Sequence, residues 1–275
     1  SRDAFFYLSH QLKVIWHSGF VVNFYLHVSN GNIFSRSGWQ LLTKKAHLSQ
    51  SRREGVSSAP FSCKRINNGM FMNVIIDYDA GNLKSVQRAC EKVGMASEIS
   101  SDPERVLHAE KIIFPGVGSA ESAVETLKKR GLDNAIVDFF RAGKPILGIC
   151  LGLQILLDHT EEGNKKCLGM VSGACERFKF SDRSLKIPHI GWNDIQINFE
   201  HPVLDKIEDG DQFYFVHSYY AKLLHEQEIV SSTEYGNMKF CSALAKDNLF
   251  ATQFHLEKSG ELGLKILKSF GDWNP

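Results

Sequence analysis

The segment around Cys150 constrains the fold of this chain more than any other. The apolar run Pro145–Ile149 leads to a cysteine, with Gly148 two residues before it and Gly152 two residues after it. This is the sulfur form of the G-x-S-x-G nucleophile elbow, in which a sharp strand-to-helix turn lifts one side chain above a sheet. Glycines suit both positions, because the turn is strained and a Cβ there would crowd it. A helix beginning at Leu151 would direct its amide dipoles at the sulfur and favour the reactive thiolate.

Strand and helix patterns alternate on the way to the elbow. Short apolar β-branched runs predict buried strands, and apolar residues at helical spacing predict helices between them. The predicted strands are 73–77, 95–100, 111–114 and the run into Cys150, and the predicted helices are 83–94, one opening at 102–104, 119–129 and 132–142. Such alternation implies parallel βαβ units in a doubly wound α/β sheet. Sites of these sheets lie beyond the carboxyl ends of the strands, where 77–82, 115–118 and Cys150 fall.

The second half of the domain has a different pattern. Strand-like runs separated by short turns predict antiparallel hairpins joined to the parallel core, at 194–199, 212–220, 228–233, 239–245 and 249–254. A last amphipathic helix is expected around Leu262–Phe270. The fold class is therefore α/β, a mostly parallel sheet with an added antiparallel hairpin region.

Residues 1–71 differ from the rest in composition. They hold nine lysines and arginines against two acids, whereas the remainder holds 23 basic and 29 acidic residues and offers no electrostatic case for nucleic-acid binding. The apolar run 14–26 is broken by His, Ser and Asn, which argues against a membrane span, and it sits too far from any small-residue cleavage site for a good signal peptide. An organellar transit peptide stays possible. We favour an unstructured or non-native N-terminal extension over 1–71, with no function assigned to it, and a functional domain over 72–275.

The cysteines indicate the compartment. Six are scattered through the chain, at 63, 90, 150, 167, 175 and 241, without a C-x-x-C pair. This spacing argues against a zinc site or a disulfide framework and fits a reducing compartment. We therefore expect a cytoplasmic protein with no membrane association, no metal and no cofactor.

A cysteine nucleophile needs a base, a group that orients the base, and donors for an oxyanion. His255 follows the apolar run 249–254, and Glu257 lies two residues later. On an extended segment these two side chains would point the same way, so Glu257 would hold the tautomer of His255. Pro115–Gly118 has the features of an oxyanion loop, because its glycines let backbone N–H groups turn toward a ligand.

These motifs together resemble a known family. Gly148–Gln154, with Cys150 at its centre, and Gln253–Ser259, with His255 and Glu257, resemble the class I (triad) glutamine amidotransferases. The stretches 77–85, 188–193 and 213–220 resemble the glutaminase subunits of imidazole glycerol phosphate synthases. The resemblance covers residues 72 to about 272, and it implies a flavodoxin-like sheet.

The resemblance implies a role for each matching residue. Cys150 would attack the carboxamide of glutamine, His255 would move protons, and Glu257 would orient His255. The remaining roles fall into three groups: oxyanion donors at Gly116, Val117, Gly118 and Leu151; glutamine contacts at Gln154, Ser218 and Tyr219; and partner-facing or gating positions at Asn82, Trp192, Tyr214 and Lys258. The ammonia would pass to a separate cyclase subunit, a (β/α)8 barrel, in a heterodimer that makes imidazole glycerol phosphate and the aminoimidazole carboxamide ribotide.

One position departs from the family pattern, and three alternatives stay open. The usual His-Pro-Glu is His255-Leu256-Glu257 here, which removes a backbone constraint on His255 but keeps both functional side chains. The alternatives are a glutaminase feeding another synthase, such as that of anthranilate or pyridoxal phosphate, a cysteine hydrolase or stress protein on a similar sheet, and a catalytically silent binding subunit. Pro188–Asn193 and the 77–82 turn argue against the first, and Gln154 and Glu257 against the second.

Overall fold

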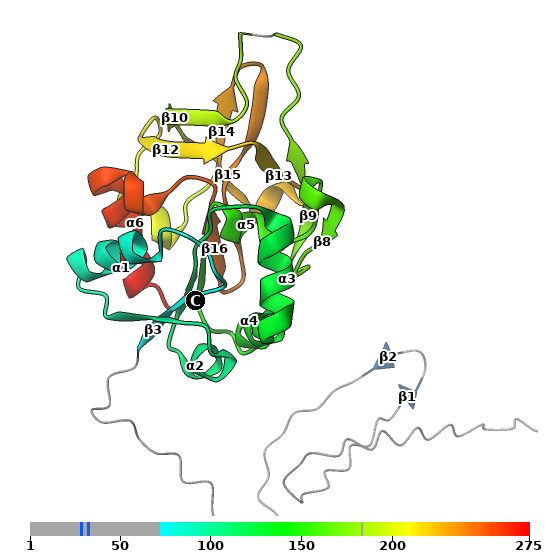
Figure 1. Ribbon diagram of the computed structural model, residues 1–275, viewed down its shortest axis with the longest axis vertical. Helices are drawn as coiled ribbons and strands as arrows, with labels where there is room; N and C mark the ends of the chain where they lie inside the picture. The colour runs from blue at the N-terminus through cyan, green and yellow to red at the C-terminus, as the bar shows by residue number, and fades with distance from the viewer. Residues whose placement is uncertain (1–27, 30–31, 34–71, 183) are drawn as a thin grey trace, which may run out of the picture. The chain divides into compact units, whose positions relative to one another are not determined.

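A computed structural model of the chain describes residues 28–29, 32–33, 72–182 and 184–275 (Figure 1). Two short strands, β1 (Val28–Ser29) and β2 (Asn32–Ile33), pair antiparallel. The rest of 1–71 lies outside the described residues, so the extension predicted there stays a prediction. None of the helices that the structure describes is long and apolar enough to span a membrane.

Five parallel strands form one half of the main sheet. Their spatial order is β4 (Ser97–Ser100), β3 (Asn73–Ile76), β5 (Ile112–Phe114), β6 (Ile146–Ile149) and β16 (Leu249–Thr252). β3, β5 and β6 are buried throughout, which explains their unbroken apolar sequence. The predicted parallel core is confirmed.

Helices cover both faces of this parallel half (Figure 1). The helices are α1 (Leu83–Lys92) and α6 (Gly260–Asp272) on one face, and α2 (Pro103–His108), α3 (Ala120–Arg130) and α4 (Leu132–Arg141) on the other. Alternate strand residues divide between the two cores: Val74 and Ile76 pack with α2–α4, and Ile75 packs with α1 and α6. This alternation is the two-residue period of a strand buried on both sides.

Antiparallel strands extend the sheet beyond β16. In order, they are β15 (Met238–Lys246) and β13 (Tyr219–Leu223), followed by β9 (Val171–Arg177), β7 (Leu157–Thr160) and β8 (Lys165–Lys166), with β14 (Ile229–Tyr235) and β11 (Gln196–Ile197) branching from β15. All these neighbours pair antiparallel except β7 and β9, which are parallel. The added hairpin region is thereby confirmed.

A separate two-stranded ribbon lies in the upper part of the view in Figure 1. It consists of β10 (His189–Asp194) and β12 (Gln212–His217), paired antiparallel. The short helices are α5 (Leu151–Ile155) and the 3-10 turns η1 (Glu162–Asn164), η2 (Pro202–Leu204), η3 (Glu226–Glu228) and η4 (Leu256–Lys258).

Two predicted strands differ from the structure, and some strands were not predicted. The single strand expected over 212–220 is two strands, because the chain leaves the ribbon at Ser218 and joins β9 of the main sheet. The strand expected over 194–199 is split between the end of β10 and β11. Strands β7 to β9 were not predicted, because Gly, Ser, Ala and charged residues in them have low strand propensity.

Candidate active site

Cys150 occupies a strained turn between β6 and α5. Its backbone has φ 54° and ψ −106°, a conformation that non-glycine residues rarely adopt. The Cys150 N–H donates to the Thr252 carbonyl at 2.7 Å, which ties the turn to the end of the neighbouring strand β16. The strain predicted for the elbow therefore falls on the cysteine itself, and surrounding hydrogen bonds hold it.

Close packing explains the two flanking glycines. A Cβ on Gly148 would lie 2.9 Å from the Cβ of Ala251, and a Cβ on Gly152 would overlap the carbonyl oxygen of Phe114. The helix that follows is shorter than the elbow pattern predicts, since α5 ends at Ile155. The helix dipole therefore contributes less to a thiolate than a full-length helix would.

His255 and Glu257 form a buried pair. His255 is 1% exposed, and its Nδ1–H donates to Oε1 of Glu257 at 2.8 Å. The extended geometry expected for this segment is wrong, because residues 256–258 form the 3-10 turn η4, which folds Glu257 back beside the imidazole. His255 N–H also donates to the Tyr214 carbonyl at 3.0 Å, so both the backbone and the ring of His255 are held.

The electrostatics favour a charged imidazole next to the sulfur. Burial alone would lower the pKa of His255, but the neighbouring Cys150 and Glu257 outweigh it and raise that pKa to about 10. The Nε2 atom of His255 is buried and has no hydrogen-bond partner in the part of the chain that the structure describes. This nitrogen is therefore free to exchange a proton with Cys150 or with a bound substrate.

Asn82 contacts the same carboxylate. Its Nδ2 donates to Oε1 of Glu257 at 2.6 Å, from a left-handed residue with φ 67° at the start of α1. Asn82 was predicted to face a partner. The structure places it against Glu257 and thus close to the chemistry.

A cavity of about 340 Å³ adjoins Cys150 and His255. Nine of the residues assigned a role from the sequence line it or flank its mouth: Val117, Gly118, Cys150, Leu151, Gln154, Ser218, Tyr219, His255 and Lys258. Gly116 does not line it, because it packs against Leu151 and Tyr78, whose hydroxyl donates to the Pro115 carbonyl. Glu162, Pro188, Val216 and His217 also line the cavity and were not identified from the sequence.

Two glutamine amides connect the cavity wall to the nucleophile. Nε2 of Gln154 donates to the Tyr219 carbonyl at 3.0 Å and to Oε1 of Gln253 at 3.1 Å. Nε2 of Gln253 in turn lies 3.6 Å from Sγ of Cys150 and donates to it. Gln253 had no assigned role, although it belongs to the same motif as His255.

The cavity offers complementary groups for an amino-acid substrate. Glu162 brings a carboxylate, whose Oε2 accepts the Ala120 N–H at 2.7 Å, and such a carboxylate suits an ammonium group. Within the described residues, the backbone N–H groups of Val117, Gly118 and Leu151 donate to no protein acceptor. Free amides beside a nucleophile are the donors that an oxyanion needs.

Two more predicted residues, Trp192 and Tyr214, lie on the ribbon, with Lys258 of η4 beside them. Trp192 is 54% exposed and packs edge-on against Tyr214, with ring centroids 6.1 Å apart. Nζ of Lys258 lies 5.6 Å from the centroid of Tyr214. Ile190, two residues before Trp192 on β10, is 59% exposed. An exposed apolar patch of this kind, next to a reactive cavity, is typical of a protein interaction surface.

Leu256 replaces the family proline without disturbing His255. His255 has φ −88° and ψ 107°, an extended conformation that a following proline would also require. Leu256 is 1% exposed and packs in the core formed with α1 and α6. Side-chain packing therefore holds the backbone where the family uses a ring.

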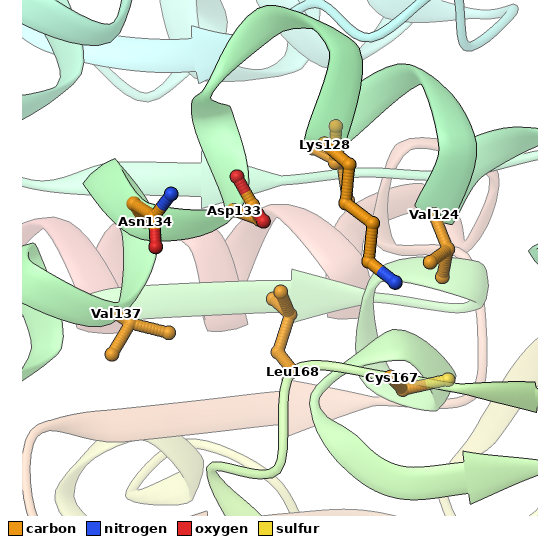
Figure 2. Close-up of a pocket in the computed structure, with 8 residues that line it drawn as sticks. Val124, Lys128, Asp133, Asn134, Val137, Cys167 and Leu168 are labelled. Carbon is orange, nitrogen blue, oxygen red and sulfur yellow. The ribbon is translucent and has the colours of Figure 1, made fainter.

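A second cavity, of about 170 Å³, lies between α3 and α4 (Figure 2). Figure 2 shows Lys128 on one wall and Cys167 with Leu168 on another. Burial raises the pKa of Cys167 to about 11, so its thiol stays protonated at neutral pH. Among the described residues, no histidine lines this cavity beside its cysteine, in contrast to the cavity at Cys150.

Comparisons with known proteins point to one family. A family model described as glutamine amidotransferase class-I matches residues 74–272. The imidazole glycerol phosphate synthase subunit HisH of Dehalococcoides mccartyi (strain CBDB1) is 44% identical over 200 residues, covering 72% of this chain and 96% of the relative. The subunit of the same name from Geobacter sulfurreducens is 45% identical over 203 residues, covering 72% and 97%.

Solved structures agree on the fold. A crystal structure of a glutamine amidotransferase has a TM-score of 0.57 at 16% identity, covering 72% of this chain and 98% of that one. The structure of PurLQS from Thermotoga maritima has a TM-score of 0.56 at 20% identity, covering 73% and 97%.

Proposed function

The chain belongs to the class I glutamine amidotransferase family, and from this membership and the cavity at Cys150 we propose that it is the glutaminase subunit of an imidazole glycerol phosphate synthase. The observation that carries the proposal is the convergence of Cys150, the His255–Glu257 pair and the Gln154 amide at one cavity. The proposal assigns the activity to residues 72–275, in the cytoplasm, and none to 1–71.

The chemistry begins with attack on the side-chain carboxamide of glutamine. The Cys150 thiolate forms a C–S bond to the carboxamide carbon, and the carbonyl oxygen becomes an oxyanion that the free amides of Gly118 and Leu151 stabilise. The C–N bond then breaks as His255 passes its proton to the departing nitrogen, which leaves as ammonia.

Water completes the reaction. His255, now neutral, takes a proton from water, and the hydroxide attacks the thioester carbon. The C–S bond breaks, which regenerates the Cys150 thiolate, and the product leaves as glutamate after giving one proton to water. Glu257 keeps its hydrogen bond to Nδ1 throughout, so that Nε2 is the nitrogen that moves protons.

Glutamine fits the groups of the cavity. The α-ammonium would pair with the carboxylate of Glu162, and Gln154, Ser218 and Tyr219 would hold the rest of the substrate. Gly116 would have an indirect role. A side chain there would collide with Tyr78 and Leu151, so glycine at this position lets the loop pack close enough for Val117 and Gly118 to line the cavity.

The partner would be a cyclase subunit, a (β/α)8 barrel, in a heterodimer. The similar proteins carry the name of a synthase subunit, and the exposed ribbon with Ile190 and Trp192 adjoins the cavity beside Tyr214 and Lys258. Ammonia is protonated in neutral water, so a direct path into a partner keeps it nucleophilic. The cyclase would use it to make imidazole glycerol phosphate and the aminoimidazole carboxamide ribotide.

The test compares nitrogen sources in the complex with the cyclase. We expect the Cys150→Ala complex to lose glutamine-dependent formation of imidazole glycerol phosphate by at least about 10⁴-fold, because no thioester forms. The same complex should retain synthesis from added ammonium salt, which bypasses the cysteine. Retention of glutamine-dependent synthesis, or a glutamate release rate that the cyclase leaves unchanged, would contradict the proposal.

A further inference from the structure

Two buried histidines next to the cavity have no part in the reaction described above. His189 on β10 and His217 at the end of β12 are cross-strand partners, 2% and 5% exposed. Nδ1 of His189 lies 3.2 Å from Nε2 of His217. The His189 ring stacks on Tyr235 and Phe215, with centroids 4.1 and 5.0 Å away. Both rings are thus held in fixed positions, and His217 lines the cavity.

Hydrogen bonding determines the tautomer of each ring. Nδ1 of His217 lies 2.8 Å from the Tyr219 carbonyl, which can only accept, so Nδ1 of His217 carries the hydrogen. Nε2 of His217 must then accept, and Nδ1 of His189 donates to it. Nε2 of His189 then carries no hydrogen and accepts from Nδ2 of Asn193 at 3.4 Å. The direction of every bond follows from one backbone carbonyl.

The pair is neutral, as these tautomers require. Burial lowers the pKa of His189 to about 4. Burial also lowers the pKa of His217 to about 3, although the hydrogen bond to the Tyr219 carbonyl acts in the opposite direction. A positive charge on His217 would also repel the imidazolium of His255 across the cavity.

The same carbonyl orients the glutamine amides on the cavity wall. Tyr219 O accepts a second bond from Nε2 of Gln154, whose other hydrogen goes to Oε1 of Gln253. Gln253 is thereby turned so that its Nε2 faces Sγ of Cys150. Because both hydrogens of the Gln154 amide are engaged, its Oε1 is left as an acceptor for a ligand.

We propose that His217 and His189 are positioning residues of the active site: together they hold the Tyr219 carbonyl in place, and this carbonyl sets the orientation of the Gln154 and Gln253 amides beside Cys150. The inference rests on the proposed glutaminase function and adds residues to that site. Its effect falls first on glutamine binding, through Gln154, and second on Cys150, through Gln253.

Two substitutions at His217 separate positioning from packing. The amide nitrogen of asparagine reaches the place of Nδ1, so His217→Asn keeps a donor for Tyr219. The amide of glutamine reaches the place of Nε2, so His217→Gln keeps the contact with His189 but loses that donor. We expect the KM for glutamine to rise about threefold in His217→Asn and at least about tenfold in His217→Gln, the loss of one buried hydrogen bond.

The full chain with its cyclase is used for kinetics, with thermal unfolding of each variant measured in parallel. The exposed His225→Gln is the control and should leave KM unchanged. Equal KM values for the two His217 variants, or KM changes that only follow their losses in melting temperature, would overturn the inference and leave a packing role.

Nitrogen-15 NMR of the wild-type imidazoles gives a readout that does not depend on glutamine. We expect hydrogen on Nδ1 of both His189 and His217 at neutral pH. Hydrogen on Nε2 of either ring would overturn this inference alone. A wild-type complex that hydrolyses no glutamine, with the expected tautomers present, would overturn the proposed function instead.

Discussion

Glu257 receives two hydrogen bonds on one carboxylate oxygen, from His255 at 2.8 Å and from Asn82 at 2.6 Å. Its other oxygen is buried and has no partner in the described part of the chain. The orientation of this carboxylate, and with it the tautomer of His255, therefore depends on Asn82 as much as on the imidazole. Asn82 belongs to the turn that precedes α1, far from Glu257 in the sequence.

Replacing Asn82 with glycine tests this dependence. Glycine keeps the positive φ and removes only the amide, so Asn82→Gly should lower the kcat of glutamine hydrolysis about tenfold, the effect of losing one hydrogen bond to a charged group. The KM should change less than about twofold, since Asn82 does not line the cavity.

Asp79→Gly is the matched control for Asn82→Gly. Asp79 has the same φ of 67° in the same turn, but its side chain pairs with Arg130 and not with the triad. Its kcat should equal that of the wild type. An unchanged kcat in Asn82→Gly would show that His255 alone holds Glu257.

Sequence motifs predicted Cys150 and His255 as site residues, because each stands in a compact pattern with a chemical meaning, and the family resemblance added Gln154. They did not locate Glu162 or His217. Glu162 follows β7, a strand that the propensities did not predict, and a lone histidine in an apolar strand has no distinguishing pattern. Only the folded chain brings these two side chains to the cavity.

At the scale of elements, the elbow depends on close contact between β5 and α5. A Cβ on Gly152 would overlap the Phe114 carbonyl oxygen at the end of β5, and a backbone atom cannot move aside as a flexible side chain can. The chain therefore accepts glycine, a weak helix former, in the first turn of α5.

Gly152→Ala should lower the free energy of unfolding by about 3 kcal/mol, the upper range for overpacking a core. It should also abolish most glutaminase activity, because Cys150 is attached to the displaced turn. Urea denaturation monitored by tryptophan fluorescence measures the first effect.

Gly271→Ala serves as the comparison for Gly152→Ala. Gly271 lies in α6, where an added Cβ would meet only Sδ of Met95 at 3.8 Å. This variant should be as stable as the wild type or gain up to about 1 kcal/mol from helix propensity. Equal stability of the two alanine variants would show that the Phe114 contact relaxes easily.

The change of sheet at Ser218 is the element-level feature that the sequence concealed. Residues 212–220 are mostly aromatic and β-branched, and the single Ser218 among them is too weak a signal to predict a break. The break exists because the two halves of the run pair with different strands: β12 pairs with β10, and β13 pairs with β9. It places His217, Ser218 and Tyr219 together at the cavity.

At the scale of the whole molecule, the neutral histidine pair links stability to pH. The folded pKa values of His189 and His217, about 4 and about 3, lie below the unfolded value near 6.5. The unfolded state therefore binds more protons in acid. Their contribution to stability is complete above pH 6.5 and is lost as the pH falls from 6.5 toward 4 for His189 and toward 3 for His217.

Each histidine should thus add a slope of about 1.4 kcal/mol per pH unit to the free energy of unfolding between pH 6 and 4.5. We expect His217→Asn to reduce the wild-type slope by about that amount, whatever its stability at pH 7. His225→Asn, at an exposed position, is measured in parallel for comparison. Parallel slopes for wild type and His217→Asn would contradict a buried neutral His217.

By itself, the sequence determined the strained, glycine-flanked turn at Cys150 and the alternation of strands and helices that makes a parallel sheet. Both are local, since a glycine-flanked cysteine and the period of apolar residues need no knowledge of distant contacts. What only the tertiary structure decided is which distant residues meet. β6 and β16 pair in parallel with Ile149 beside Thr252, so the segments after them, carrying Cys150 and Gln253, leave the sheet at the same edge.

The tertiary structure also decided how the site is supported. The short turn η4, the hydrogen bond from Asn82 and the tautomers of His189 and His217 all depend on partners far away in the chain. Burial and hydrogen-bond direction arise only when these partners are in place, and no local pattern encodes them.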